Sequence, residues 1–287
     1  MLATLLAWSE PLAKAVTYGA LLLVIGVSGA RWTTIRAWPR HERLDDVHER
    51  LDRVALAGAA TLLLALLARA WAHTVTAFGA AESFVWGNVR LVAVDSRWGS
   101  AWRTQVASAL VVLVFALAAD LWRRRRWRGL VTLAACGTAF ALTGSGHAAS
   151  SAWLRAVHAL HLVAAGAWVG TLSTLLVAAR HRPSDERLRA FHHVAPLAGV
   201  AVSAMLATGL VMAVRYLGGV DAMASSYAAW LAVKTTLVLA MLGLGAWNWS
   251  RLRGRATARW LRTIDVEVLA ALLVVLATAI LTETAHP

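Results

Sequence analysis

The sequence predicts an all-α membrane protein that crosses the bilayer several times, with about eight transmembrane helices in one bundle. The first observation is composition: of the 287 residues, 59% are hydrophobic and 15% are charged. The mean hydropathy is +0.62, which is too apolar for an ordinary soluble domain. The second is that apolar residues gather in stretches of about 20, the length of a spanning helix. The third is that Lys and Arg gather in alternate connections between these stretches.

These stretches predict eight spans, and residues 1–287 are expected to form a single membrane-embedded domain. In chain order the predicted spans are residues 15–34, 54–74, 104–122, 129–147, 153–178, 192–216, 228–249 and 264–284. Tryptophan supports several of the boundaries, because its amphipathic ring favours the bilayer interface. It lies near an end of the first, second, third, fifth and seventh spans, as Trp32, Trp71, Trp102, Trp122, Trp153, Trp230 and Trp249.

The fourth and eighth spans have similar ends, since a Leu-Thr pair in each is followed shortly by a histidine, His147 and His286. The third and seventh spans also open alike. This similarity predicts two halves, residues 1–150 and 151–287, related as a 4+4 parallel repeat. Chance likeness between apolar segments is the alternative.

Membrane topology explains the net charge of +13. Most of the 28 Lys and Arg lie between residues 31 and 53, 123 and 128, 180 and 189, and 251 and 262. These connections are expected to face the cytoplasm, and eight spans then place both termini on the periplasmic side. The charge therefore requires no nucleic acid partner, and membrane lipids are the expected surroundings.

The longest outer connection, residues 75–103, contains Trp86, Trp98 and Trp102 beside Glu82. Tryptophans of this kind favour the headgroup region. Two placements are open: over the outer mouth of the bundle, or along the membrane surface.

Histidines within and beside the spans are the main candidates for chemistry, because ionisable groups inside a membrane are costly. His158 and His161 are three residues apart in the fifth span and so share one helix face. By helix rise they lie roughly 7 to 12 Å below Trp153. His73, His147 and His286 lie at the outer ends of three other spans. Neutral imidazole suits copper, zinc, nickel and haem iron, so these five histidines are candidate metal ligands.

Each histidine also has a structural interpretation. His73, His147 and His286 are equally well explained as polar residues at the bilayer interface. For His158 and His161 the alternative is an interhelical hydrogen bond that holds the bundle together.

Sulfur side chains matter if the metal is Cu(I), which favours thiolate and thioether ligands. Cys136, Met205 and Met241 lie near mid-span, and Met212 lies toward the outer side. These residues are candidates for a pathway through the bundle. The alternative is ordinary packing, since Met and a single Cys are common in apolar cores.

Other polar groups in the spans are candidates for the pathway or for support of the ligands. Trp168 follows His161 by seven residues on the same helix face. Lys234 lies about 9 Å into the seventh span and either extends toward the interface or pairs with a carboxylate. Glu267 is expected to pair with a nearby arginine, with proton coupling as the alternative. Gly166 and Gly170 form a GxxxG pattern that predicts close helix approach.

No pattern of a hydrolase elbow, a phosphate-binding loop or a dinucleotide fingerprint is present in the sequence. ATP-driven pumping and soluble-type catalysis therefore lack support, and the protein is not expected to be an enzyme.

The fifth span resembles the signature helix of the copper resistance protein D (CopD) family of bacterial inner-membrane proteins. The residues that carry the resemblance are His158-x-x-His161, Ala165, Trp168-Val169-Gly170 and Leu172. Further matches downstream are Thr208-Gly209-Leu210, the segment from Ser226-Tyr227 to Lys234, Asn248 and Glu267. The chain departs from the family pattern at Thr171 and Ala228, where Gly is usual.

The resemblance implies a multi-pass protein of the bacterial inner membrane that handles copper, with a periplasmic copper-binding protein as a partner. The leading hypothesis is movement of copper between periplasm and cytoplasm, in copper homeostasis or resistance. Copper would be bound by His158 and His161 with help from His147, His73 and His286. A haem b-binding redox protein is the first alternative, because paired histidines on facing helices ligate haem. A structural subunit whose histidines only pack is the second.

Overall fold

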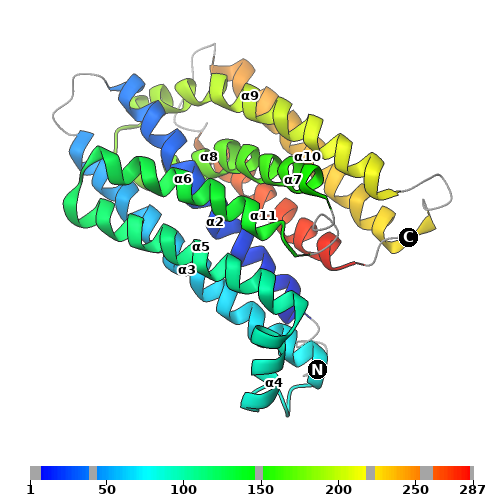
Figure 1. Cartoon of the computed structure of the whole chain (residues 1–287). Helices are drawn as coiled ribbons and strands as arrows, with labels where there is room; N and C mark the ends of the chain where they lie inside the picture. The colour runs from blue at the N-terminus through cyan, green and yellow to red at the C-terminus, as the bar shows by residue number, and fades with distance from the viewer. Residues whose placement is uncertain (1–7, 39–43, 146–150, 218–223, 253–260, 285–287) are drawn as a thin grey trace.

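The computed structural model describes residues 8–38, 44–145, 151–217, 224–252 and 261–284. Every regular element in these ranges is helical, which confirms the predicted all-α class (Figure 1). His147 and His286, two of the candidate ligands, lie outside the described residues.

Each predicted span corresponds to one helix of the structure, and most of the helices extend past the apolar stretches into polar residues. The predicted spans 129–147 and 264–284 end beyond their helices, which stop at Leu142 and Glu283. The elements are α2 (Ser9–Ala37), α3 (Leu44–Phe78), α4 (Trp86–Arg90), η1 (Leu91–Asp95), α5 (Arg97–Trp122), α6 (Arg125–Leu142), α7 (Ala152–Ala165), η3 (Gly166–Gly170), α8 (Thr171–Ala178), α9 (Ser184–Leu217), α10 (Ser226–Leu252) and α11 (Leu261–Glu283). The labels η1 and η3 denote π-helical turns. The elements α7, η3 and α8 follow one another without a break as a single long helix, Ala152–Ala178.

Seven helices in the described ranges are long and apolar enough to cross a membrane, so the protein is a multi-pass membrane protein. The remaining predicted span corresponds to α6, which begins with Arg125, Arg126 and Arg128 and is therefore less apolar. It packs beside α5 along the bundle. The eighth crossing, the side on which the termini lie and the 4+4 repeat stay predictions.

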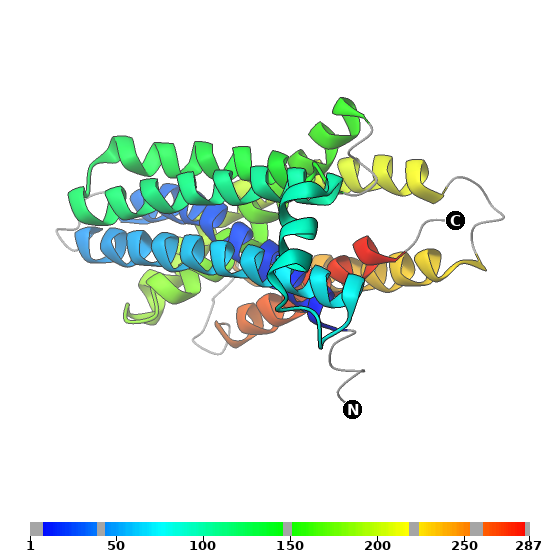
Figure 2. The ribbon, with the colours of Figure 1, turned by 60° about the horizontal axis from the view of Figure 1, so that its bottom comes forward.

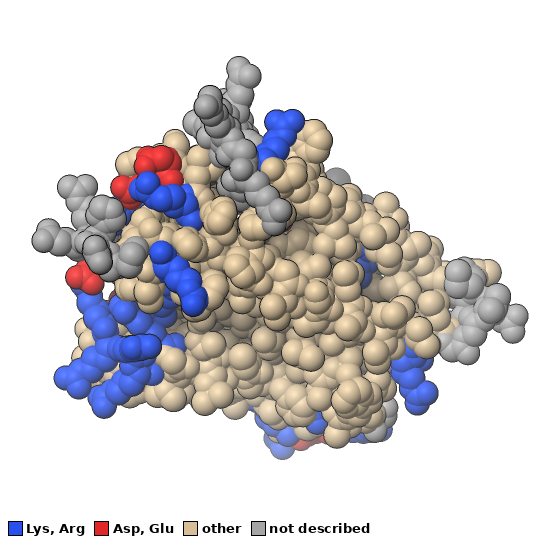
Figure 3. All heavy atoms as spheres, turned by 90° about the horizontal axis from the view of Figure 1, so that it is seen from above, with Lys and Arg blue, Asp and Glu red and all other residues tan. Residues whose placement is uncertain are grey.

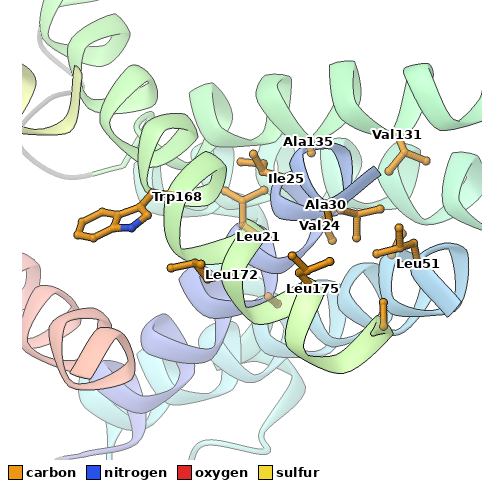
Figure 4. Packing of buried hydrophobic residues seen from close by; sticks show 14 of the residues in the cluster. Leu21, Val24, Ile25, Ala30, Leu51, Val131, Ala135, Trp168, Leu172 and Leu175 are labelled. Atoms are coloured by element: carbon orange, nitrogen blue, oxygen red, sulfur yellow. The ribbon is translucent and has the colours of Figure 1, made fainter. Parts of the chain in front are cut away.

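Helix α2 runs through the middle of the bundle, with α3, α6, α8 and α11 packed around it (Figures 1 and 2). Its central position follows from its sequence, since apolar residues lie on all of its faces. Leu21, Val24 and Ile25 of this helix are almost fully buried. They meet side chains of α3, α6 and α8, such as Leu51 and Leu175 (Figure 4). A core built on one central helix fixes where the neighbouring helices lie.

The closest helix contact occurs where α2 crosses η3, at Gly26 and Gly170. A β-carbon at either glycine would overlap backbone atoms of the other helix. Gly166 lies one turn earlier, where a β-carbon would come within 2.7 Å of the Ile25 side chain. The close approach expected from Gly166 and Gly170 is therefore confirmed, and its partner is α2.

The positively charged residues gather toward one end of the molecule, whereas the apolar middle carries few charges (Figure 3). At this end, Asp52 of α3 is buried between Arg31 of α2 and Arg128 of α6. Nη2 of Arg128 lies 2.6 Å from Oδ2 of Asp52. Removing one partner from a buried ion pair leaves an uncompensated charge, so this triad ties the three helices together.

The long connection after α3 forms the short helix α4 and the turn η1, and it packs against the ends of α3 and α5. Phe84 and Trp86 are 80% and 75% exposed, as expected for side chains at a membrane surface. Trp98 stacks on His73, with ring centroids 4.2 Å apart. The segment contributes no described residue to the cavities described below, and both of its predicted placements stay predictions.

Candidate functional site

His158 and His161 project from α7 into a small cavity between α2, α7, α9, α10 and α11. The cavity has a volume of about 100 Å³ and contains both imidazoles. Their neighbours there include Lys14, Tyr18, Ser145, Met212, Tyr216, Tyr227 and Lys234. The spacing of three residues therefore does what the sequence predicts and places both rings on one helix face.

The orientation of His161 is fixed by α9. Its Nδ1 lies 3.1 Å from the carbonyl oxygen of Met205 and 3.0 Å from Oγ1 of Thr208. A carbonyl oxygen can only accept a hydrogen bond, so Nδ1 carries the proton and donates it. In the neutral ring Nε2 then keeps its lone pair, which is the form that binds a metal ion.

His158 is held differently. Its Nδ1 is buried, and no hydrogen-bond partner for it exists among the described residues. An interhelical hydrogen bond therefore explains the position of Nδ1 in His161. It does not explain Nδ1 of His158, which neither donates nor accepts a hydrogen bond among the described residues. A buried polar atom without a partner indicates a site that a ligand, ion or water completes.

A larger cavity of about 320 Å³ adjoins the first and shares His161, Tyr18 and Lys234 with it. Its wall is mainly apolar and contains Met205 and Met241, while Met212 lines the smaller cavity. The three methionines named from the sequence thus surround the histidine pair. Cys136, on α6, lines neither cavity.

Lys234 reaches both cavities from α10 and lies close to the two imidazoles. In the ranges that the structure covers, no hydrogen bond or ion pair of its ammonium group is found. Pairing with a carboxylate therefore does not describe Lys234 in these ranges, and its extension toward the interface stays a prediction. A positive charge next to two neutral imidazoles is a defining electrostatic feature of the site.

Several residues of the site were not predicted from the sequence. Nζ of Lys14 lies 2.5 Å from Oε1 of Glu283 and 3.4 Å from the carbonyl oxygen of Thr282, which joins α2 to α11 beside the smaller cavity. Tyr18 lines both cavities. The sequence shows that Lys14 and Tyr18 lie near the end of a span. It does not show which helices pack together, and this packing brings them to the site.

Glu267 lies in a third cavity, of about 560 Å³, between α8, α9, α10 and α11. It is 4% exposed, and Nδ2 of Asn248 donates to its Oε2 at 3.0 Å. The indole N–H of Trp168 also donates to this carboxyl group, so within the described ranges Glu267 is held by an amide and an indole and not by an arginine. Trp168 lines both this cavity and the 320 Å³ cavity and therefore lies between Glu267 and the histidines.

His73 does not reach the histidine cavity. Its Nδ1 lies 2.9 Å from Oε1 of Glu10 on α2, and its ring stacks on Trp98. Across the residues that the structure describes, no three His, Cys, Asp or Glu side chains come together as metal ligands. The structure thus pairs His158 with His161 and leaves His73 apart, at the outer end of α3.

Comparison with protein families gives two matches that together span most of the chain. Residues 4–156 match the model described as copper resistance protein D-like, N-terminal domain. Residues 185–281 match the model described as copper resistance protein D. The chain belongs to the copper resistance protein D family.

Membership of the CopD family confirms the resemblance seen in the sequence, and the chain is a copper-resistance membrane protein. Thr208, Lys234, Asn248 and Glu267 lie within the second match. The histidine pair lies between the two matched segments, so its assignment rests on the geometry above. Comparison with curated proteins and with solved structures gave no match.

Proposed function

We propose that this CopD family protein moves copper between the periplasm and the cytoplasm, with His158 and His161 as the binding residues. The observation that carries the proposal is the pair of imidazoles in one cavity, where His161 is oriented by α9 and Nδ1 of His158 has no described partner. Imidazole nitrogen together with thioether sulfur suits copper. Met212, in the same cavity, is a thioether candidate.

The charge of Lys234 fits copper as a passing substrate better than copper as a permanently bound cofactor. Two like charges a few ångströms apart repel strongly in a poorly solvated cavity. A substrate site must bind strongly enough to be filled and weakly enough to be emptied. The ammonium group beside the imidazoles lowers copper affinity in this way.

Haem b is the alternative, and the described geometry does not favour it. Bis-histidine ligation takes one imidazole on each side of the haem plane. His158 and His161 project from the same helix, and in the described part of the chain no other histidine lines the two adjoining cavities. An absorption spectrum of the purified protein tests this alternative, because bound haem gives a Soret band.

The test is copper accumulation in cells that make the wild-type protein, His158→Ala, His161→Ala or His73→Ala, together with copper binding by each purified protein. We expect His158→Ala and His161→Ala to lose copper binding and to lose the change in cellular copper that the wild-type protein causes. His73→Ala should keep both properties. The sign of the wild-type change gives the direction of transport. Unchanged copper binding in His158→Ala and His161→Ala would refute the proposal.

A further inference from the structure

A second polar site lies beyond Trp168, around the buried carboxyl group of Glu267. The described residues that line its cavity come from η3, α8, α9, α10 and α11, and among them Glu267 alone has an ionisable side chain. On the neighbouring helix α9, the ring of His192 packs on Trp249 of this cavity, with ring centroids 5.6 Å apart. A carboxylate in such surroundings needs a bound cation or a proton to balance it.

Asn248 is suited to hold Glu267 in either protonation state. As the structure stands, the amide donates from Nδ2 to Oε2, which suits the ionised carboxylate. Oδ1 of the same amide is buried, and it has no partner among the described residues. Rotation of the amide by half a turn would present Oδ1 to a protonated carboxyl group, which can donate to it. The pair can therefore bind and release a proton without moving a helix.

The ligand of this site differs in class from that of the histidine cavity. Carboxylate and amide oxygens are hard donors, whereas Cu(I) favours sulfur and imidazole nitrogen. The indole of Trp168 forms a wall common to both sites and points away from the α2 core (Figure 4). Apart from the indole N–H, which donates to Glu267, this wall is apolar, so a charge on one side is felt on the other with little screening.

We propose that Glu267 and Asn248 form a proton-binding site that couples copper movement to a proton moving the opposite way. The inference rests on the proposed function. A copper ion that enters beside His158 and His161 adds positive charge next to Lys234 and favours ionised Glu267, so the carboxyl group releases its proton. When the ion leaves, the proton returns, and for Cu(I), which carries a single charge, the charge of the bundle interior is the same in both states.

The first test is the pH dependence of copper binding by the purified protein. His158 and His161 also exchange protons with copper, but they do so equally in the wild type and in Glu267→Gln. Release of one further proton makes affinity rise by about tenfold per pH unit. We therefore expect the copper affinity of Glu267→Gln to rise less steeply with pH than that of the wild type, by up to about tenfold less per pH unit. Glu82 is an exposed carboxylate on the outer connection, so Glu82→Gln should keep the wild-type pH dependence.

The second test uses proteoliposomes with a pH dye inside. Copper entry should drive proton exit in vesicles with the wild-type protein and in those with Glu267→Asp, which keeps a carboxyl group in the cavity. It should not do so in vesicles with Glu267→Gln. Replacing sodium by choline should change nothing. Wild-type proton exit in Glu267→Gln, loss of copper binding in that variant, or dependence on sodium would each overturn the inference.

These outcomes separate the two proposals. If the wild-type protein neither binds nor moves copper, the proposed function fails. If copper moves through the wild type without any proton movement, only the coupling fails.

Discussion

At the scale of single residues, Thr208 connects the packing of α9 to the chemistry of His161. Its Oγ1 lies 3.0 Å from Nδ1 of the imidazole, and it donates to the carbonyl oxygen of Ala204 at 2.7 Å. Because that hydroxyl hydrogen is already used, the oxygen is free to accept from the ring. Such partners keep a ligating imidazole in the correct tautomer and orientation.

Replacing Thr208 by Val keeps the shape of the side chain and removes this acceptor. We expect copper affinity to fall about tenfold, the lower end of the range for residues that orient a metal ligand, because the carbonyl of Met205 still holds the ring. Copper titration of the purified variant measures this.

The matched control is Thr235→Val, since Thr235 lines the adjoining cavity and donates in the same way to the carbonyl oxygen of Leu231 at 2.8 Å. Its copper affinity should equal that of the wild type. Equal losses in both variants would show that Thr208 acts only through the helix.

Single residues also show where prediction from sequence ends. The joint location of His158, His161 and Lys234 follows from one rule, because polar side chains inside a membrane protein turn toward its interior. The choice of partners does not follow. His73 pairs with Glu10 and Glu267 with Asn248, and both pairings depend on which helices pack side by side.

At the scale of elements, the crossing of α2 over η3 depends on two glycines. A β-carbon at Gly26 would meet backbone atoms of Gly170, which cannot rotate aside as a side chain can. We expect Gly26→Ala to lower the free energy of unfolding in detergent by about 1–3 kcal/mol, the usual cost of overpacking. Denaturant titration followed by circular dichroism measures the change.

Gly19 offers a control on the same helix, because a β-carbon there meets no atom within 4 Å. Gly19→Ala should raise the free energy of unfolding by about 0.5–1 kcal/mol, since alanine is the better helix former. If Gly26→Ala is as stable as Gly19→Ala, the two helices do not cross where the structure has them.

The long helices could be predicted because apolar stretches separated by charged connections specify them almost alone. The π-helical turn η3 could not, since its residues also suit a regular helix. Such turns often occur at functional sites. Here the turn bears Trp168 and the glycine that meets α2, and both roles become visible only once the partner helix is known.

At the scale of the whole molecule, the distribution of positive charge predicts which end faces the cytoplasm. The single cysteine, Cys136, allows a direct test, because Cys136→Ser leaves a background without thiols. In that background, Gly87→Cys in α4 should react with a membrane-impermeant maleimide added from the periplasmic side. Ser184→Cys, at the start of α9, should react only after the inner membrane is opened.

Both positions are exposed, so a difference in labelling reports the side of the membrane and not burial. The reverse pattern would invert the orientation. Labelling of both positions from the periplasm would mean that the number of crossings between α4 and α9 is even, contrary to the eight-span arrangement.

The crossing at Gly26 and Gly170 also limits how this bundle can change shape. Backbone contact on that side leaves no space for sliding, so we expect α2 and η3 to move together. Helix α10 is the opposite case, because only 6% of the residues in its apolar stretch are buried. It packs mainly on α11. If the histidine cavity opens and closes, we therefore expect α10, which bears Lys234 and Asn248, to be the helix that moves.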